Sequence, residues 1–159
     1  MAACERVPDT DESDKFNTNS VEPIGDYTID PKTGEVRATH TDARGVTTTM
    51  RSGDTVVATL PAPFTNYPSA TISYATQVQQ GEEASVTIEF STPEAAEKVL
   101  AHYEAQAAQA QIEPDIAISA GDTTTLAGTN RRTDLSFALQ VTRTNDGTTG
   151  QLSVASGLD

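Results

Sequence analysis

Few residues in this sequence are of the types that carry out covalent catalysis. Nucleophilic catalysis needs a Ser, Thr or Cys beside a base, and the chain of 159 residues has one cysteine, Cys4, and two histidines, His40 and His102. His40 falls on an exposed-looking strand position, and His102 falls on the surface of a predicted helix, next to Tyr103. The sequence contains no glycine-rich phosphate loop and no nucleophile elbow. We therefore predict no catalytic residue.

Charged residues offer weaker leads to a site. With 23 acidic residues, some pair of carboxylates will fall at the separation that glycosidases use, and this has no meaning without a cleft. Arg131-Arg132 is the one pair of adjacent cations, and it falls in a predicted turn, where it could hold an anion or simply be solvated. Asp30, Glu35 and Asp42 lack the order of a calcium loop. We predict no metal site and no cofactor.

The charge of the whole chain excludes one class of partner. The formal net charge is −13, with ten Lys and Arg residues in all. Each phosphate contact needs a Lys or Arg side chain, so we predict no binding to nucleic acid and no direct binding to anionic lipid. No apolar run approaches the roughly 20 residues needed to cross a bilayer.

The first four residues resemble part of a targeting signal. Met1-Ala2-Ala3-Cys4 is similar to the end of a bacterial lipoprotein signal, in which an apolar residue and two small residues precede the cysteine that receives the lipid. This resemblance implies lipidation of Cys4, membrane attachment through that lipid, and a location in the cell envelope, facing the periplasm. The leader that precedes such a box would lie upstream of Met1. The alternative is an ordinary cytoplasmic start that contains a cysteine.

Residues 1–24 are predicted to form a lipobox-like start followed by a disordered acidic tether. Between Glu5 and Asp14 there are five acidic residues and hardly an apolar residue to bury. Such a segment would space a folded body from a bilayer. We predict that residues 25–159 form that body, with a β-meander over 25–60 and a second unit over 61–159.

Residues 25–60 show the two-residue period of strands with one buried face. Turn signals at Asp30–Gly34 and Asp42–Gly45 divide this run into three. The threonines of residues 46–50 suit a sheet with one wet face, because β-branched side chains fit the pleat. A three-stranded meander follows.

Residues 61–159 are predicted to combine one helix with antiparallel strands. Three prolines in residues 61–68 favour an extended connector whose aromatic side chains, Phe64 and Tyr67, can plug a core. A hairpin should follow, with its turn at residues 79–81. Apolar residues at three- and four-residue spacing predict a helix from Pro93 to Gln111, capped by a hydroxyl of Ser91 or Thr92.

Further strands are predicted at residues 116–118, 122–126 and 135–141, and Asn145-Asp146-Gly147 predicts the turn into a last strand. The expected fold class is therefore α+β: mostly antiparallel β with one main helix packed on the sheet, preceded by a β-meander and a disordered N-terminal tail.

Short motifs along this second unit resemble a family of uncharacterised bacterial envelope lipoproteins. The family has a "YPGA" segment, a strand that ends in "F-T" before a helix carrying "F-Y", and a final "dGT" hairpin. The corresponding residues here are Tyr67-Pro68-Ser69-Ala70, Phe90-Ser91-Thr92-Pro93, His102-Tyr103 and Asp146-Gly147-Thr148. The resemblance implies a helix on an antiparallel sheet and an exported location, and no activity.

Three functions follow from these observations, in order of preference. The first is a non-catalytic, membrane-tethered envelope domain that binds a protein, a glycan or a small ligand. The second is a structural or assembly protein that pairs through an exposed edge strand of the meander. The third is a hydrolase, which would need a deep pocket lined with polar groups.

Overall fold

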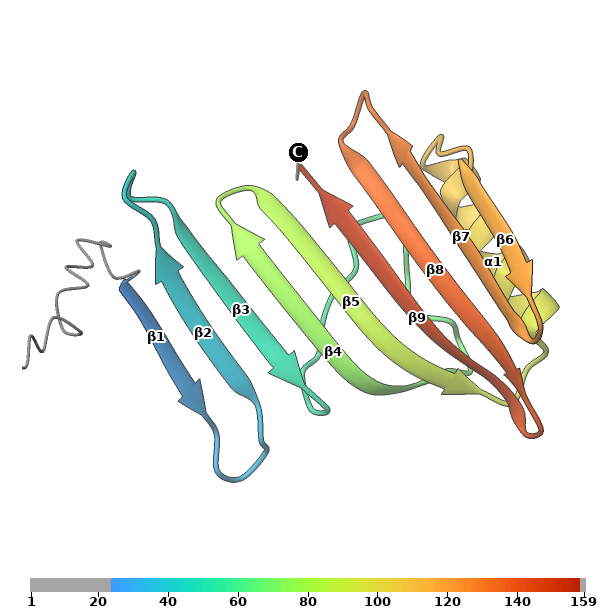
Figure 1. Ribbon diagram of the computed structural model, residues 1–159, viewed down its shortest axis with the longest axis horizontal. Coiled ribbons are helices and arrows are strands. Elements are labelled where there is room, and N and C mark those ends of the chain that lie inside the picture. Colours follow the sequence, from blue (N-terminus) through green and yellow to red (C-terminus); the bar gives the residue numbers. More distant parts are fainter. Residues whose placement is uncertain (1–23, 158–159) are drawn as a thin grey trace, which may run out of the picture.

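The structure is a computed structural model, and it describes residues 24–157. These residues form one antiparallel sheet of nine strands and one helix, seen face-on in Figure 1. In chain order the elements are β1 (Ile24–Ile29), β2 (Val36–Thr41), β3 (Thr47–Gly53), β4 (Thr71–Gln80), β5 (Glu83–Thr92), α1 (Ala96–Gln109), β6 (Ile116–Ala120), β7 (Thr123–Asn130), β8 (Leu135–Thr144) and β9 (Gly147–Ser156). The expectation of a mostly antiparallel sheet with one helix is confirmed. The start and tether were predicted over residues 1–24; Cys4 and the rest of residues 1–23 lie outside the described residues, and Ile24 is already the first residue of β1.

The strand order is β1-β2-β3-β4-β5-β9-β8-β7-β6. Strands β1 to β5 follow one another as neighbours, whereas the chain after α1 continues at the far edge and returns inward from β6 to β9. The last strand, β9, therefore lies between β5 and β8 and pairs with both over most of its length. Strands β1 and β6 form the two edges of the sheet.

The two turns of the meander form where the sequence predicts them, whereas the β4–β5 turn, predicted at residues 79–81, lies at Gly81-Glu82, because Gln79 and Gln80 still pair within the hairpin. Gly34 (φ 73°) and Gly45 (φ 84°) take up the left-handed conformation that glycine adopts without strain. The side chain of Asp30 accepts a hydrogen bond from the Lys32 amide at 2.8 Å, and Asp42 receives the Arg44 amide at 2.8 Å. These side chains replace the backbone partners that the tight turns remove.

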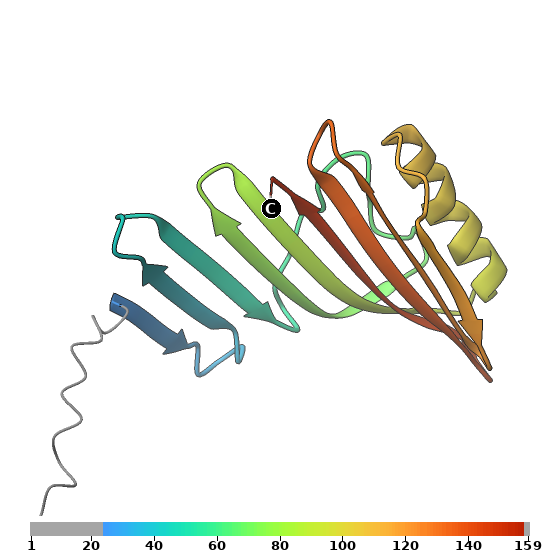
Figure 2. The ribbon, with the colours of Figure 1, turned by 45° about the horizontal axis from the view of Figure 1, so that its top comes forward.

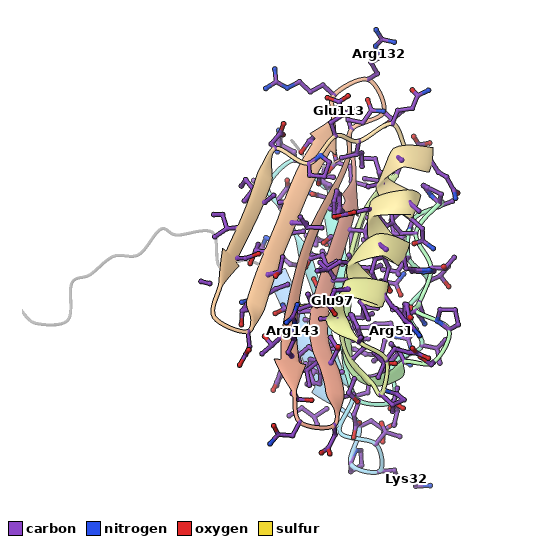
Figure 3. All side chains as sticks on the ribbon, turned by 90° about the vertical axis from the view of Figure 1, so that its right-hand side faces the viewer. Lys32, Arg51, Glu97, Glu113, Arg132 and Arg143 are labelled. Atoms are coloured by element: carbon purple, nitrogen blue, oxygen red, sulfur yellow. The ribbon has the colours of Figure 1, made fainter. Side chains whose placement is uncertain are left out.

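One face of the sheet is covered and the other is open. Helix α1 and the connector that joins β3 to β4 lie on the same face, behind the sheet in Figures 1 and 2, and Figure 3 shows the sheet and the helix as separate layers. The core fills the space between these layers. Its fully buried side chains include Phe64 of the connector, Val99 and Tyr103 of α1, and Leu139 and Leu152 of the sheet. We call the uncovered side the open face.

The connector contributes to this core as predicted for Phe64, which is 2% exposed and packs against Phe137 with ring centroids 5.4 Å apart. Tyr67 is only partly buried. The meander ends at Gly53, so residues 54–60, expected within it, belong to the connector, and Val56 and Leu60 are buried in the core. Neither the connector nor α1 extends behind β1 and β2.

The helix is shorter than predicted and its cap is different. It begins at Ala96 instead of Pro93, and its N-cap residue, Ala95, provides no side-chain hydrogen bond. The two expected caps, Ser91 and Thr92, are instead the last residues of β5. The Thr92 hydroxyl lies 2.6 Å from that of Ser69 and receives the Glu94 amide at 3.2 Å. The hydroxyl thus stabilises the bend between strand and helix.

Candidate functional site

The two histidines lie on different elements and on opposite faces of the sheet. His40 is exposed on β2 and faces the open side. His102 is half-buried on α1, where its ring meets that of Tyr67 edge-on with centroids 5.0 Å apart. Burial lowers the pKa of His102, so the ring is neutral near pH 7. Its Nε2 lies 3.1 Å from the side-chain nitrogen of Gln106.

A shallow cleft of about 550 Å³ opens beside His102. It is lined by Tyr67, Pro68, Ser69, Glu94, Lys98, Ala101 and His102. Several of its polar groups are already paired, because the Ser69 hydroxyl lies 2.6 Å from that of Thr92 and Lys98 donates to Glu94 at 3.0 Å. Among the described residues, no hydroxyl bonds to His102. The arrangement supports a structural role for this histidine, as expected from its place on the helix.

Gln106 is a polar residue of the helix–connector contact that the sequence reasoning missed. It is 8% exposed and holds residue Thr65 of the connector with two hydrogen bonds. Its Oε1 receives the Thr65 amide at 3.0 Å, and its Nε2 donates to the Thr65 hydroxyl at 2.7 Å. The signal that could have revealed it is its position, three residues after Tyr103 on the buried stripe of the helix.

Arg131 and Arg132 lie in an exposed turn after β7, as predicted. Together with Glu113 and Asp115 they line an open cleft of about 980 Å³ at the end of α1. Arg132 points away from the body, as labelled in Figure 3. The buried polar residue in this region, Asn130, is satisfied, since it donates to the Ala110 carbonyl at 2.9 Å and receives the Arg132 amide at 2.9 Å. The cleft therefore has no unsatisfied polar group at its base.

A charged cluster at the base of the meander was also missed. Glu35 is 9% exposed, and one of its oxygens, Oε1, accepts hydrogen bonds from Arg37 and Arg51, each at 2.8 Å. Arg37 and Arg51 are direct neighbours on adjacent strands, on the covered side of the sheet. These two hydrogen bonds hold the pKa of Glu35 below its usual range. The cluster joins β2, β3 and the turn before them.

Residues 24–157 contain no group of three or more His, Cys, Asp or Glu side chains that could bind calcium or another metal ion. Asp30 and Asp42 each serve their own turn, and Glu35 binds the two arginines. Within the same residues, the helix is neither long nor apolar enough to span a membrane.

The open face carries the most extensive uncovered surface. Opposite residues on neighbouring strands form a row from edge to edge across all nine strands. The row runs Ile29, Val36, Ser52, Thr76, Thr87, Ser153, Ala138, Ala127 and Ile116. Its centre is made of short polar side chains joined by hydrogen bonds, such as Thr87 to Ser153 at 2.8 Å. Its ends are isoleucines. The open face is thus polar in the middle and apolar at both edges.

The apolar end at the meander includes large exposed side chains. Tyr27 is 65% exposed and Ile29 is 53% exposed on β1, and Tyr74 of β4 is 40% exposed. Met50 and Val78, opposite each other on β3 and β4, are half-buried on the same face. Contiguous apolar side chains on a surface mark sites of interaction more often than isolated ones.

The other end is strand β6. All five of its residues are exposed, with Ile116 at 45% and Ile118 at 60%. Among the described residues, β6 pairs only with β7, so its second side has free backbone groups. The sequence reasoning expected a free edge in the meander, and the structure has one there, β1, and a second one at β6.

Known proteins offer no guide to this surface, because comparison of the chain with protein families, curated proteins and solved structures finds no match. The strand order, the open face and the two edges are therefore what the chain itself provides for assigning a role.

Proposed function

We propose that this protein is a non-catalytic binding module of the cell envelope that presents the open face and edges of its sheet to a protein partner. The observation that carries the proposal is the contrast between the two faces of the sheet. Behind the central strands one face is covered by α1 and the connector, whereas the open face bears exposed Tyr27, Ile29, Ile116 and Ile118 at its two edges. Side chains of this kind gain free energy when a partner removes them from water, at about 25 cal/mol per Å².

A lipid on Cys4 would hold the module at the membrane. This part of the proposal is supported by the residues before and at Cys4 and by the acidic sequence that follows them. Diacylation provides enough apolar surface for stable attachment, since each buried CH₂ contributes about 0.8 kcal/mol. The proposal places the module in the cell envelope, on the periplasmic side of the membrane.

The anchoring is tested by expressing the gene with its natural upstream sequence in a Gram-negative host that is fed a labelled fatty acid. We expect label on the mature protein and partition into the detergent phase, and neither with Cys4→Ser. An aqueous, unlabelled protein with a free thiol would refute the anchor and leave the cytoplasmic alternative.

The binding surface is tested by placing a photo-reactive residue either at Gln140, exposed on the open face, or at Ala105, exposed on the far side of α1. We expect one discrete crosslinked product in intact cells from Gln140 and none from Ala105. Equal crosslinking from both positions would contradict the proposal, because it would indicate random encounters.

A glycan as ligand is less favoured, because the exposed large side chains on the open face are mainly aliphatic. Assembly through an edge strand is the second candidate function, and the unpaired edges β1 and β6 support it. Sedimentation velocity separates the two candidates, because assembly predicts oligomers of the chain alone.

A further inference from the structure

Strand β6 is the shortest strand of the sheet, with five residues, but it lacks the other features by which proteins protect an exposed edge. Edge strands are usually shielded by charged residues, proline or a bulge. The sequence of β6 is Ile-Ala-Ile-Ser-Ala, without a charge or a proline, and its pairing with β7 is regular from Ile116 to Ala120. The opposite edge, β1, carries a charge at Asp26. Of the two edges, β6 is the one open to a further strand.

The side chains of β6 define what an added strand must carry. Ile116 and Ile118 lie on the open face, beside Ala127 and Thr125 of β7. Ala117 lies on the other face, opposite Leu126, and is small. Cross-strand neighbours stabilise a sheet when apolar side chains meet on one face. An incoming strand should therefore be apolar at alternate positions, on the open face.

The ends of β6 define the charge of that strand. Glu113 and Asp115 precede β6, and Asp122 follows it. None of the three carboxylates forms an ion pair with a described residue, although Arg131 and Arg132 line the same cleft as Glu113 and Asp115. Lys or Arg at the ends of the incoming segment would lie near these carboxylates, and charge of this kind speeds encounter and fixes register.

The same carboxylates disfavour pairing of β6 with a second copy of itself. In an antiparallel pair related by a two-fold axis, the start of each strand lies beside the end of the other. Asp115 of one copy would then approach Asp122 of the second. The net charge of −13 adds repulsion between copies.

We propose that β6 is a docking site at which an extended segment of a partner protein, apolar at alternate positions and with Lys or Arg at both ends, adds as a tenth strand. This inference rests on the proposed binding function and specifies its partner. Backbone hydrogen bonds would supply affinity, and the isoleucines and flanking carboxylates would supply selectivity.

The test uses the full chain and a labelled synthetic peptide, Lys-Lys-Val-Thr-Val-Thr-Val-Lys-Lys, followed by fluorescence anisotropy at low salt. A second peptide has Glu at all four Lys positions, and a third has Pro at the central Val. We expect the first peptide to bind about tenfold or more tighter than either of the others, since charge and the free amide both contribute. Equal binding of the three peptides would overturn the proposal.

Two matched variants locate the site. Ile118→Lys places a charge on the docking edge, and Ile29→Lys makes the same change on the same face at the opposite edge. We expect Ile118→Lys to weaken binding about tenfold and Ile29→Lys to change it by less than about twofold. Equal losses from both variants, or a loss from Ile29→Lys alone, would refute the assignment to β6.

A third variant avoids any change in the strand itself. Replacing Glu113, Asp115 and Asp122 by Gln, Asn and Asn should reduce the preference for Lys-ended over Glu-ended peptide several-fold while leaving the circular dichroism spectrum unchanged. An unchanged preference would overturn the charge argument. Bound peptide should also slow hydrogen exchange at residues 116–120 and not at residues 24–29, and the reverse pattern would contradict docking at β6.

These results are separable from those for the general function. Crosslinking from Gln140 without an effect of Ile118→Lys on the peptide would retain the module and remove this docking site. Self-association of the chain that Ile118→Lys abolishes would replace the partner segment by a second copy and so refute the proposal.

Discussion

The meander and the helix-covered half of the sheet use the same alternation of residues in opposite phase. In β8 the large apolar residues point to the covered face and are buried: Leu135, Phe137, Leu139 and Val141. In β1 and β3 the large apolar residues, Tyr27, Ile29 and Met50, point to the open face. Both halves belong to one hydrogen-bonded sheet. The comparison shows that backbone pairing can extend a sheet well beyond the core that stabilises it.

Without a second layer, the meander depends on local contacts. Its stability comes from ladder hydrogen bonds, the Glu35 cluster and small pairs such as Thr41 with Thr47, whose hydroxyls are 3.0 Å apart. Regions with few buried apolar contacts open at lower free energy than the core of the same protein. The following predictions test this difference between the two halves.

The largest effect is expected from truncation in the covered half. Leu139 is fully buried, so Leu139→Ala should lower the free energy of unfolding by about 3 kcal/mol. The matched change in the meander, Met50→Ala, should cost about 1 kcal/mol or less, because this side chain is half-exposed. Urea denaturation of both variants measures the difference. Similar losses of stability would contradict this difference, because they would mean that Met50 is packed as fully as Leu139.

A smaller effect is expected from adding a methyl group. A Cβ at Gly150 would lie 2.8 Å from Cε1 of Phe90, whose ring is buried against it, so Gly150→Ala should cost about 2 kcal/mol by overpacking. Gly34→Ala in the meander meets no atom within 4 Å and should cost about 1 kcal/mol, because its φ is 73°. Thermal unfolding of the pair checks the order, and a reversed order would contradict it.

The Glu35 cluster should make the meander sensitive to acid. The pKa of Glu35 is lowered in the folded protein, so its ion pairs stabilise the fold above the ordinary carboxyl pKa of about 4.3 and this contribution is lost as the pH falls through the folded value. As the pH is lowered, amide exchange corrected for its intrinsic pH dependence should show β2 and β3 losing protection at a higher pH than β8 and β9.

Glu35→Gln provides the control for this titration. It should lower the protection of β2 and β3 near neutral pH and remove most of their extra sensitivity to acid. Wild-type and variant curves that coincide at neutral pH would show that the cluster contributes nothing.

The smallest effect is expected at Tyr103. Its hydroxyl is the only buried side-chain N or O atom of the described residues without a well-formed hydrogen bond, although the Tyr67 backbone lies close enough to it to lower its pKa slightly; burial outweighs this contact and raises the pKa of Tyr103 to about 12. Tyr103→Phe removes a desolvated group, so it should leave stability within about 1 kcal/mol of the wild type, on the stabilising side.

Thr148→Val is the matched control, since the Thr148 hydroxyl is equally buried but donates to the Glu94 carbonyl at 2.8 Å. It should destabilise by about 1 to 2 kcal/mol, because the carbonyl loses its partner. A loss from Tyr103→Phe as large as that from Thr148→Val would indicate a hydrogen bond to Tyr103.

The sequence predicted the local elements better than their assembly. Turns with Asp and Gly, such as Asp42–Gly45, have a local physical cause, and so does the apolar stripe of α1. The insertion of β9 between β5 and β8 depends on contacts between residues 56 to 72 positions apart, which alternation does not encode. The Thr92 hydroxyl was misassigned for the same reason, because its partner Ser69 is distant in sequence.

The candidate surface was predicted only in part. A free edge was expected in the meander, but β6 was not identified as an edge, because a short strand of this composition also suits a sheet interior. The Glu35 cluster and Gln106 depend on partners 16 and 41 residues away, so their roles became visible only in three dimensions.

The central position of β9 has a consequence for biosynthesis. Ribosomes release β1 to β8 first, yet β5 and β8 lack a common neighbour until residues 147–156 emerge. Until then, the first five strands and the three strands after the helix remain two separate halves, each with apolar side chains still exposed to water. Closure of the fold is a late event, dominated by contacts between distant parts of the chain, and should be slow compared with that of helical proteins.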